Sequence, residues 1–294
     1  MSASSSVTDH RRGASLAAAG VLVVSFDALL IRLAIAPVAT ILFWRGLFMA
    51  LSLGLVFRLQ RGPQCWSELR AGGKAALGVI VTMGLSQVLF VVGVEYTSVA
   101  NAVVILTAAP LFAALFSGLF LREWLPLRTW VAILACIGGI AIVFGGSVGA
   151  GHWVGDAAAL MAAASIGASL TQMRHLAGLN RSAVIAGAGV LACALAAPFA
   201  SPTAMDGTTF LVLAIMGLVQ IPLALLLVAT ATRYLPSAEV SLFLVVEAVL
   251  GPLWVWLALG EEPPGWTLIG GTVVIATLAI HSWVSLRQER LELA

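Results

Sequence analysis

Charged residues are scarce in this chain of 294 residues: only 10% are Asp, Glu, Lys or Arg, whereas 61% are hydrophobic. A soluble domain averages about 25% charged and about 45–50% apolar residues. The 15 basic and 13 acidic side chains are too few to cover the surface of a soluble protein of this length. The composition therefore excludes a secreted disulfide domain, a disordered chain and a conventional nucleic-acid binder, and it predicts a polytopic membrane protein.

Cysteine, lysine and enzyme signatures are also sparse. The three cysteines are an odd number without metal-ligand spacing, so we interpret them as small apolar side chains rather than as disulfide or zinc ligands. The sequence has no His-Glu-x-x-His pattern and no dinucleotide-binding glycine pattern, and its single lysine, Lys74, belongs to no nucleotide-binding motif. We therefore expect a protein without cofactor or metal that is neither an enzyme nor an ATP-driven pump.

Long apolar runs fill most of the chain. A membrane-spanning helix needs about 20 predominantly apolar residues. Ten segments meet this requirement within the uncertainty of their ends: 14–35, 38–57, 75–94, 99–120, 129–146, 154–174, 182–200, 208–231, 237–259 and 266–285. Most links between these segments are short, so consecutive helices are predicted to be antiparallel. The predicted fold is an all-α integral membrane bundle of ten transmembrane helices.

Basic residues lie on one side of this predicted topology. With a cytoplasmic N-terminus, all 15 basic residues except Arg32 and Arg45 fall in cytoplasmic segments, and those two lie within the first two helices. Basic residues in short loops set the orientation of membrane proteins. We therefore expect both termini in the cytoplasm. The Ala-, Gly- and Leu-rich composition, poor in lysine, favours a bacterial inner membrane.

The chain repeats itself at a spacing of 138 residues. At this spacing rare residue types coincide without a gap: Tyr96 with Tyr234, Glu123 with Glu261, Pro126 with Pro264 and Thr129 with Thr267. The repeat unit holds five predicted helices, an odd number, so its two copies cross the membrane in opposite directions. Inverted repeats are an architecture of secondary transporters. The predicted division is a disordered cytoplasmic N-terminus at 1–13, five-helix repeats at 14–147 and 148–286, and a cytoplasmic tail at 287–294.

Both copies carry a Tyr, a Ser- or Ala-containing entry, an intramembrane Pro, a Glu and a Gly-Gly pair. The first copy has Tyr96-Thr-Ser-Val-Ala100, Pro110, Glu123 and Gly138-Gly139, and the second has Tyr234-Leu-Pro-Ser-Ala238, Pro252, Glu261 and Gly270-Gly271. With this pattern and its 5+5 helix count, the chain resembles the EamA type of the drug/metabolite transporter superfamily. The resemblance implies that helices one to four and six to nine enclose a central cavity. It names no substrate, because relatives similar in fold move amino acids, nucleosides, sugars, cations or drugs.

Three charged residues lie deep in the predicted helices: Asp27 in the first, Arg45 in the second and Glu247 in the ninth. A charge at the bilayer centre costs roughly 2.5–3.5 kcal/mol or more, so these residues are candidates for function. Away from water a carboxyl group favours its protonated form, which makes Asp27 and Glu247 candidate proton or cation carriers. The planar guanidinium of Arg45 suits a substrate carboxylate. The alternative is that the three residues only pair with one another to support packing.

Neutral polar residues extend this candidate site. Trp44 precedes Arg45, and Gln87 and Gln220 lie near the middles of the third and eighth helices. The two amides suit a polar metabolite, although amides also hold membrane helices together with about 0.6–2 kcal/mol. Four residues near the membrane faces are candidate gates, with anchoring or helix capping as the alternative: Tyr96, Tyr234, Glu123 and Glu261.

The sequence favours a secondary transporter that exports small polar or amphipathic metabolites, above all amino acids or related compounds, by alternating access. A proton or cation is the candidate coupling ion. One alternative is a cation or multidrug exporter, in which the acids bind the substrate, and a lesser one is an intramembrane enzyme or lipid-handling protein. The expected partners are a small-molecule substrate and the lipid bilayer, with no nucleic acid, and the expected assembly is a monomer or a homodimer.

Overall fold

The computed structural model of the chain describes residues 3–62, 72–121, 127–148, 151–175, 180–203, 205–231, 234 and 237–292, and within these ranges all regular structure is helical. The helices are α1 (Ala3–Val24), α2 (Asp27–Leu33), α3 (Val38–Arg61), α5 (Gly73–Tyr96), α6 (Val99–Leu106), α7 (Ala109–Leu121), α8 (Leu127–Val148), α9 (Trp153–His175), α10 (Arg181–Ala196), α11 (Gly207–Ala214), the π-helix η2 (Ile215–Gln220), α12 (Ile221–Ala231), α13 (Ser237–Leu259) and α14 (Gly265–Glu292). Helix α1 begins at Ala3, so helical backbone reaches into the segment for which the sequence predicts disorder. Extending an established helix costs far less than nucleating one.

Seven helical stretches of the described chain are long and apolar enough to cross a membrane. Three shorter apolar stretches lie in α10, α13 and α14, at Arg181–Ala196, Val246–Leu259 and Gly265–His281. The predicted all-helical, multi-pass membrane protein is therefore confirmed, whereas the number of ten spanning helices stays a prediction.

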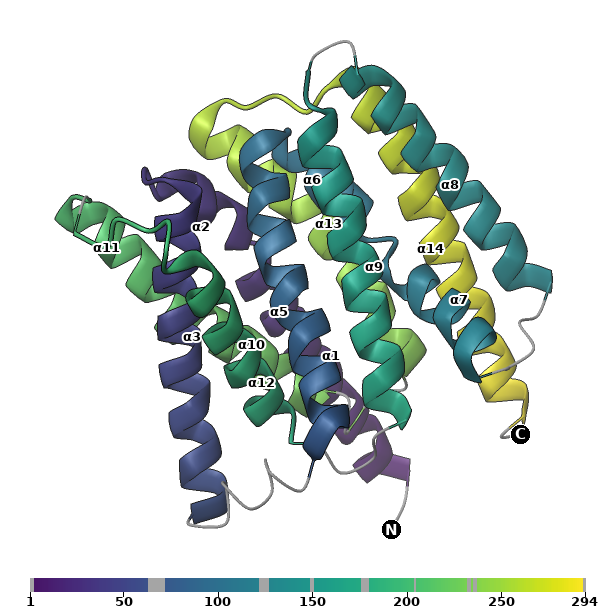
Figure 1. The fold of residues 1–294 in the computed structure, drawn as a ribbon. Helices are drawn as coiled ribbons and strands as arrows, with labels where there is room; N and C mark the ends of the chain where they lie inside the picture. Colours follow the sequence, from purple (N-terminus) through teal and green to yellow (C-terminus); the bar gives the residue numbers. More distant parts are fainter. Residues whose placement is uncertain are drawn as a thin grey trace.

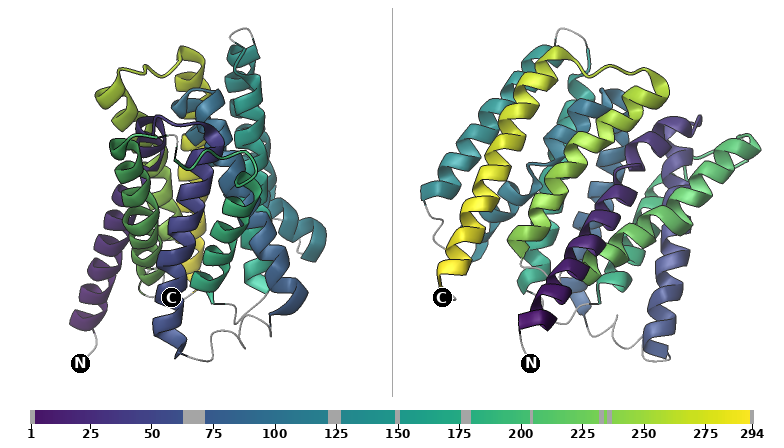
Figure 2. Two further views of the ribbon diagram at one scale, coloured as in Figure 1. Left: turned by 60° about the vertical axis from the view of Figure 1, so that its left-hand side comes forward. Right: turned by 180° about the vertical axis from the view of Figure 1, so that it is seen from behind.

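The helices form one bundle with both termini at the same end, which we call the lower end after its position in Figure 1. The principal packing pairs are α5 with α9, α3 with α10, α8 with α14, and α1 with α12. Each pair joins a helix from the first half of the chain to one from the second half. The α8–α14 pair lies at one edge of the bundle (Figures 1 and 2). The two halves interdigitate, so the centre of the bundle is built from both of them.

Helices α3 and α10 cross at a pair of glycines, which allows their backbones to touch. A Cβ on Gly46 would lie 2.6 Å from the Gly189 carbonyl oxygen and 2.8 Å from the Cys193 nitrogen. Both distances are far below van der Waals contact, and the clashing atoms belong to the backbone. Small residues at such crossings let membrane helices pack closely.

We expect Gly46→Ala to destabilise the protein by about 1–3 kcal/mol, because the α3–α10 crossing must widen to accept the methyl group. Gly54→Ala is the matched control on the same helix, since a Cβ there meets no atom within 4 Å. This control should leave stability unchanged or raise it by up to about 1 kcal/mol through helix propensity. Thermal unfolding of both variants in one detergent measures the difference, and equal stabilities would contradict the close crossing.

Two membrane helices are broken and a third is widened near their middles. The first breaks at residues 25–26, between α1 and α2, and the fourth at residues 107–108, between α6 and α7. Pro110 lies in the first turn of α7, and Pro222 is the second residue of α12, just after the π-helical turn η2, as expected of residues that cannot donate a backbone hydrogen bond. Pro252 lies inside α13, which continues through it. The sequence did not indicate the break at 25–26, which contains no proline.

Candidate functional site

The break in the first membrane helix places a buried ion pair between α2 and α3. Asp27 is the first residue of α2, and its Oδ2 lies 2.8 Å from Nη2 of Arg45 on α3. The Arg45 guanidinium also lies over the Phe90 ring of α5, 5.8 Å from its centroid. The side chains of Asp27 and Arg45 are 10% and 6% exposed. Burial of both charges is consistent with their pairing, since a lone charge there would be strongly unfavourable.

This ion pair leaves hydrogen-bonding capacity unused. Within the described part of the chain, Asp27 Oδ1 and Arg45 Nε and Nη1 are buried without a partner. Buried polar atoms in native proteins nearly always have a partner, and an unpaired one calls for an explanation such as a ligand. One acceptor and two donors thus lie in the same ion pair with no group of the described residues to satisfy them.

Glu247 on α13 adds a second carboxylate near the pair. It is half-buried, and it lies close enough to Asp27 for the two negative charges to repel each other. It forms no ion pair or hydrogen bond with the described residues, so Arg45 is the only cation paired with either acid there. The structure thus brings together Asp27, Arg45 and Glu247, which the sequence assigns to three different helices.

Gln220 holds the free end of α1. Its Nε2 donates to the carbonyl oxygens of Val23 at 3.1 Å and Val24 at 3.5 Å, which the helix break would otherwise leave unpaired. Its own Oε1 is buried without a partner in the described chain. The amide predicted to line the substrate site therefore also stabilises the break beside Asp27.

Two aromatic residues that the sequence did not assign to the candidate site pack at the same break. The Trp254 indole nitrogen on α13 donates to Ser25 Oγ at 2.9 Å. Its ring stacks on Phe26, with the ring centroids 4.9 Å apart and the planes at 10°. Trp254 lies two turns after Glu247 on α13, and this spacing is the signal that could have found it. It fixes α13 against residues 25–26.

Trp44 and Gln87 have different surroundings. The Trp44 indole donates to the Pro202 carbonyl oxygen at 3.2 Å and packs against the Phe210 ring of α11. These contacts hold α3 to α11, and none of them involves Asp27. Gln87 lies one turn before Phe90 on α5, is half-buried, and forms no hydrogen bond with the described residues. The Trp44 indole is thus occupied by a hydrogen bond, whereas the Gln87 amide has no hydrogen-bond partner among the described residues.

Gln220 and Gln87 are therefore expected to respond differently to substitution. Gln220→Ala should cost about 1–3 kcal/mol of stability, because it leaves the α1 carbonyls unpaired away from water. Gln87→Ala should leave stability within about 0.5 kcal/mol of the wild type, as substitutions that break no buried contact do. Thermal unfolding of the two purified variants checks this, and an equal loss in both would show that Gln220 has no special role at the break.

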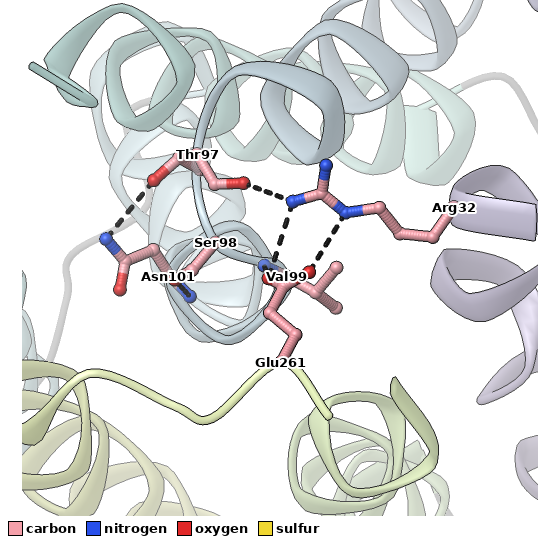
Figure 3. A network of polar contacts seen from close by, with 6 residues as sticks. All are labelled: Arg32, Thr97, Ser98, Val99, Asn101 and Glu261. Carbon is pink, nitrogen blue, oxygen red and sulfur yellow. Dashed lines mark hydrogen bonds and ion pairs between the residues drawn. The ribbon is translucent and has the colours of Figure 1, made fainter. Parts of the chain in front are cut away.

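A second polar cluster, drawn in Figure 3, lies at the upper end of the bundle, where α2 and α5 end and α6 and α14 begin (Figure 1). Arg32 near the end of α2 donates through Nη2 to the Thr97 carbonyl oxygen at 2.8 Å. Its Nε lies 3.2 Å from Oε2 of Glu261, on the link between α13 and α14. Glu261 Oε1 also accepts from the Val99 backbone N–H at 2.8 Å, which pairs a free N–H of the first turn of α6. Glu261 therefore joins α2 to the start of α6.

The cluster continues through buried neutral groups to a buried acid. Asp156, at the start of α9, is completely buried, and its Oδ1 accepts from Thr97 Oγ1 at 2.6 Å and from Asn101 Nδ2 at 3.2 Å. Thr267 on α14 donates to Asn101 Oδ1. A Cβ on Gly155 would lie 2.4 Å from the Tyr96 carbonyl carbon, so α9 approaches the α5–α6 turn closely here. We call Arg32, Thr97, Asn101, Asp156, Glu261 and Thr267 the upper cluster.

The remaining candidate gates lie at the two ends of the bundle. Tyr96 ends α5 and is 57% exposed. The Tyr234 ring lies under the Arg12 guanidinium of α1, with 5.6 Å between the guanidinium carbon and the ring centroid. Glu123 lies outside the described residues. Of the four candidates, Glu261 is the one that the structure places in a network of polar contacts.

The described residues contain no group of three or more His, Cys, Asp or Glu side chains that could hold a metal ion. Residues 145–149 match the Gly-x-Ser-x-Gly pattern of hydrolases. The pattern requires a sharp strand-to-helix turn to expose the serine, whereas Ser147 lies in the last turn of α8. The match therefore identifies no nucleophile.

The Asp27–Arg45 pair lies between α2 and α3 of the first half of the chain, and α13 and η2 of the second half pack against these two helices. The EamA-like transporter family matches the chain twice, over residues 11–145 and 153–283. The chain belongs to this family, whose members are membrane transporters of the drug/metabolite type.

Other comparisons bear on the fold alone. No curated protein matches the chain in sequence. Fifteen chains of solved structures match it, including one described only as the crystal structure of a protein. That structure is 19% identical to this chain in sequence. The two align over 92% of this chain and 97% of the other, with a TM-score of 0.65. The similarity shows that nearly all of the fold has a known architecture.

Proposed function

We propose that the protein is a secondary transporter that exports small polar or amphipathic metabolites, above all amino acids or related compounds, by alternating access. The observation that carries this proposal is the buried Asp27–Arg45 pair with three unpaired polar atoms. An amino acid offers a carboxylate and an ammonium group a few ångströms apart, which complement Arg45 and Asp27 respectively. Arginine is suited to the carboxylate, because its donors form a planar fork.

In this proposal the substrate binds by exchanging ion pairs. The substrate carboxylate accepts from Arg45 Nε and Nη1, and the ammonium group donates to Asp27 Oδ1, the atoms left unpaired in the structure. As both side chains turn toward the ligand, the contact between Asp27 Oδ2 and Arg45 Nη2 opens. Two ion pairs with the ligand replace it, so the buried charges stay compensated throughout. Gln87, with its free amide one turn before Phe90, supplies a further polar contact.

The proposed topology is ten spanning helices as two inverted five-helix repeats in the bacterial inner membrane, with the lower end of the bundle in the cytoplasm. The basic residues of the sequence support this orientation. The four packing pairs between the two halves support a site that both repeats build. Alternating access then moves one set of helices against the other around the Asp27–Arg45 pair.

A cation or multidrug exporter is the second candidate. The observation in its favour is the presence of two carboxylates, Asp27 and Glu247, beside the single guanidinium of Arg45. A lipophilic cation bound to Glu247 would balance the charge of the site. Trp254 and Phe26, stacked beside it, offer aromatic surface of the kind that binds organic cations.

A thermal-shift screen tests the two candidates against each other. A ligand that binds only the folded state stabilises it by about 2.7 kcal/mol at 100 times its Kd. Amino acids, lipophilic cations, nucleosides and sugar phosphates are added to wild-type protein, Arg45→Lys, Glu247→Gln and Glu262→Gln. Arg45→Lys keeps the charge but removes the planar fork, and the exposed Glu262 serves as the control position.

Stabilisation by amino acids that is lost in Arg45→Lys and kept in Glu262→Gln is the result we expect. Stabilisation by lipophilic cations alone, lost in Glu247→Gln, would replace the first candidate by the second. If nucleosides or sugar phosphates stabilise the protein while amino acids and cations do not, both candidates are wrong.

A further inference from the structure

Helix α2 is a short helix between two interruptions of the helical backbone. It holds seven residues, Asp27–Leu33, and is separated from α1 by the break at residues 25–26 and from α3 by a loop. Asp27 lies in its first turn and Arg32 in its last turn, about 7.5 Å apart along the axis at 1.5 Å per residue. The negative charge of Asp27 lies at the N-terminal end of the helix and the positive charge of Arg32 at the C-terminal end, where the helix dipole favours each of them.

The two charged ends of α2 have partners in different parts of the molecule. Asp27 pairs with Arg45 in the candidate substrate site, whereas Arg32 pairs with Glu261 and Thr97 in the upper cluster. Because side chains five positions apart do not share a face of a helix, neither charge can satisfy the other. One rigid helix therefore connects the site to the upper cluster.

The upper cluster joins both halves of the chain. Thr97 and Asn101 come from the first half, and Asp156, Glu261 and Thr267 from the second. All except Arg32 and Glu261 are at most 3% exposed. Glu95 on α5 is the further charged group that acts on Arg32 and Glu261. Any motion that separates α2 and α6 from α9 and α14 at the upper end must break these hydrogen bonds.

We propose that the upper cluster keeps the upper end of the bundle closed and that α2 couples it to the Asp27–Arg45 site. This inference rests on the proposed alternating access. Releasing Asp27 from Arg45 frees the first turn of α2, and the same helix then withdraws Arg32 from Glu261 and Thr97. Coupling between two sites is reciprocal, so breaking the Arg32–Glu261 pair also changes the equilibrium at Asp27.

Double electron–electron resonance between two spin labels tests the inference without any substrate. The labels are attached at Ile35→Cys, which follows α2 and is 86% exposed, and at Gly265→Cys, the first residue of α14, where a side chain meets no atom within 4 Å. The native cysteines are replaced by alanine: Cys65, Cys136 and Cys193. Distances are measured in lipid nanodiscs.

Glu261→Gln should add a longer distance between the labels. The substitution removes a charge-assisted hydrogen bond that stabilises the closed state, and losing such a bond shifts an equilibrium at least about tenfold. The ratio of open to closed molecules should rise by this factor. Glu262→Gln is the matched control, because Glu262 is exposed and forms no ion pair within the described chain. It should give the distances of the parent protein. Equal distances in all three proteins would overturn the role of the upper cluster.

Asp27→Asn tests the coupling through α2. It weakens the pair at the substrate site, and it should also populate the longer distance at the upper end. Leu30→Gly in the middle of α2 should abolish this response by softening the helix, whereas Leu30→Ala, which removes the same packing but keeps the helix, should preserve it. If Glu261→Gln opens the upper end and Asp27→Asn does not, the coupling is wrong although the upper cluster stands. Failure of the proposed substrate would leave these distances unaffected, because no ligand is present.

Discussion

Asp27→Leu is expected to lower the free energy of unfolding by about 3–5 kcal/mol, because it leaves a buried charge without its partner. The variant leaves the Arg45 guanidinium nearly inaccessible to water and without the carboxylate that lies 2.8 Å away in the structure. Arg45→Met should have a similar effect, because it strands the Asp27 carboxylate. Unfolding of both variants in the same detergent measures the two losses.

The double variant Asp27→Leu/Arg45→Met separates stability from function. Replacing a buried ion pair by apolar residues is often neutral or stabilising, so the double variant should recover most of the stability that each single variant loses. It should nevertheless fail to bind or move the substrate, because both charges of the proposed site are gone. If the single variants are as stable as the wild type, the ion pair is not buried in the working protein.

Glu247→Gln is expected to abolish the dependence of transport on a pH gradient. Glu247 lies near Asp27 and has no cationic partner among the described residues, so it is the carboxyl group of the site that is free to exchange a proton. Glutamine has nearly the same shape but carries no exchangeable charge. Substrate exchange without a pH gradient should therefore persist in the variant.

Uptake into proteoliposomes with and without an imposed pH gradient measures this difference. Glu262→Gln, which removes an exposed acid at the upper end of the bundle, should behave as the wild type. Proton-driven accumulation that is unchanged in Glu247→Gln would exclude this residue as the proton carrier and leave Asp27 as the candidate.

Much of the fold could be predicted from the sequence, because membrane helices are marked by long apolar runs and their backbone must pair within the helix. The break beside Pro110 and the widened turn before Pro222 were predictable for a related reason, since proline removes a backbone donor. The same argument predicts a break at Pro252 and is wrong there, because α13 continues through this residue. The break at residues 25–26 was not, because its cause is tertiary. There the Gln220 amide and the Trp254–Ser25 contact stabilise the broken end from other helices.

The candidate site was predictable in its charges but not in its contacts. Asp27, Arg45 and Glu247 stand out in any membrane helix because buried charge is costly. The sequence left open which of them pair, and the structure pairs Asp27 with Arg45. Asp156 was missed as a site residue because an acid at a helix start is usually a favourable exposed cap. Here the close approach at Gly155 buries it against Thr97 and Asn101.

The central claim is that the Asp27–Arg45 pair is the substrate site of a transporter, and counterflow tests it most directly. Proteoliposomes preloaded with unlabelled amino acids receive a trace of the labelled compounds outside, and uptake is followed for the wild type and for Asp27→Leu/Arg45→Met. We predict uptake above that of empty liposomes by the wild type and none by the stable double variant. Equal uptake by the two proteins, or no uptake of any amino acid by the wild type, would contradict the account.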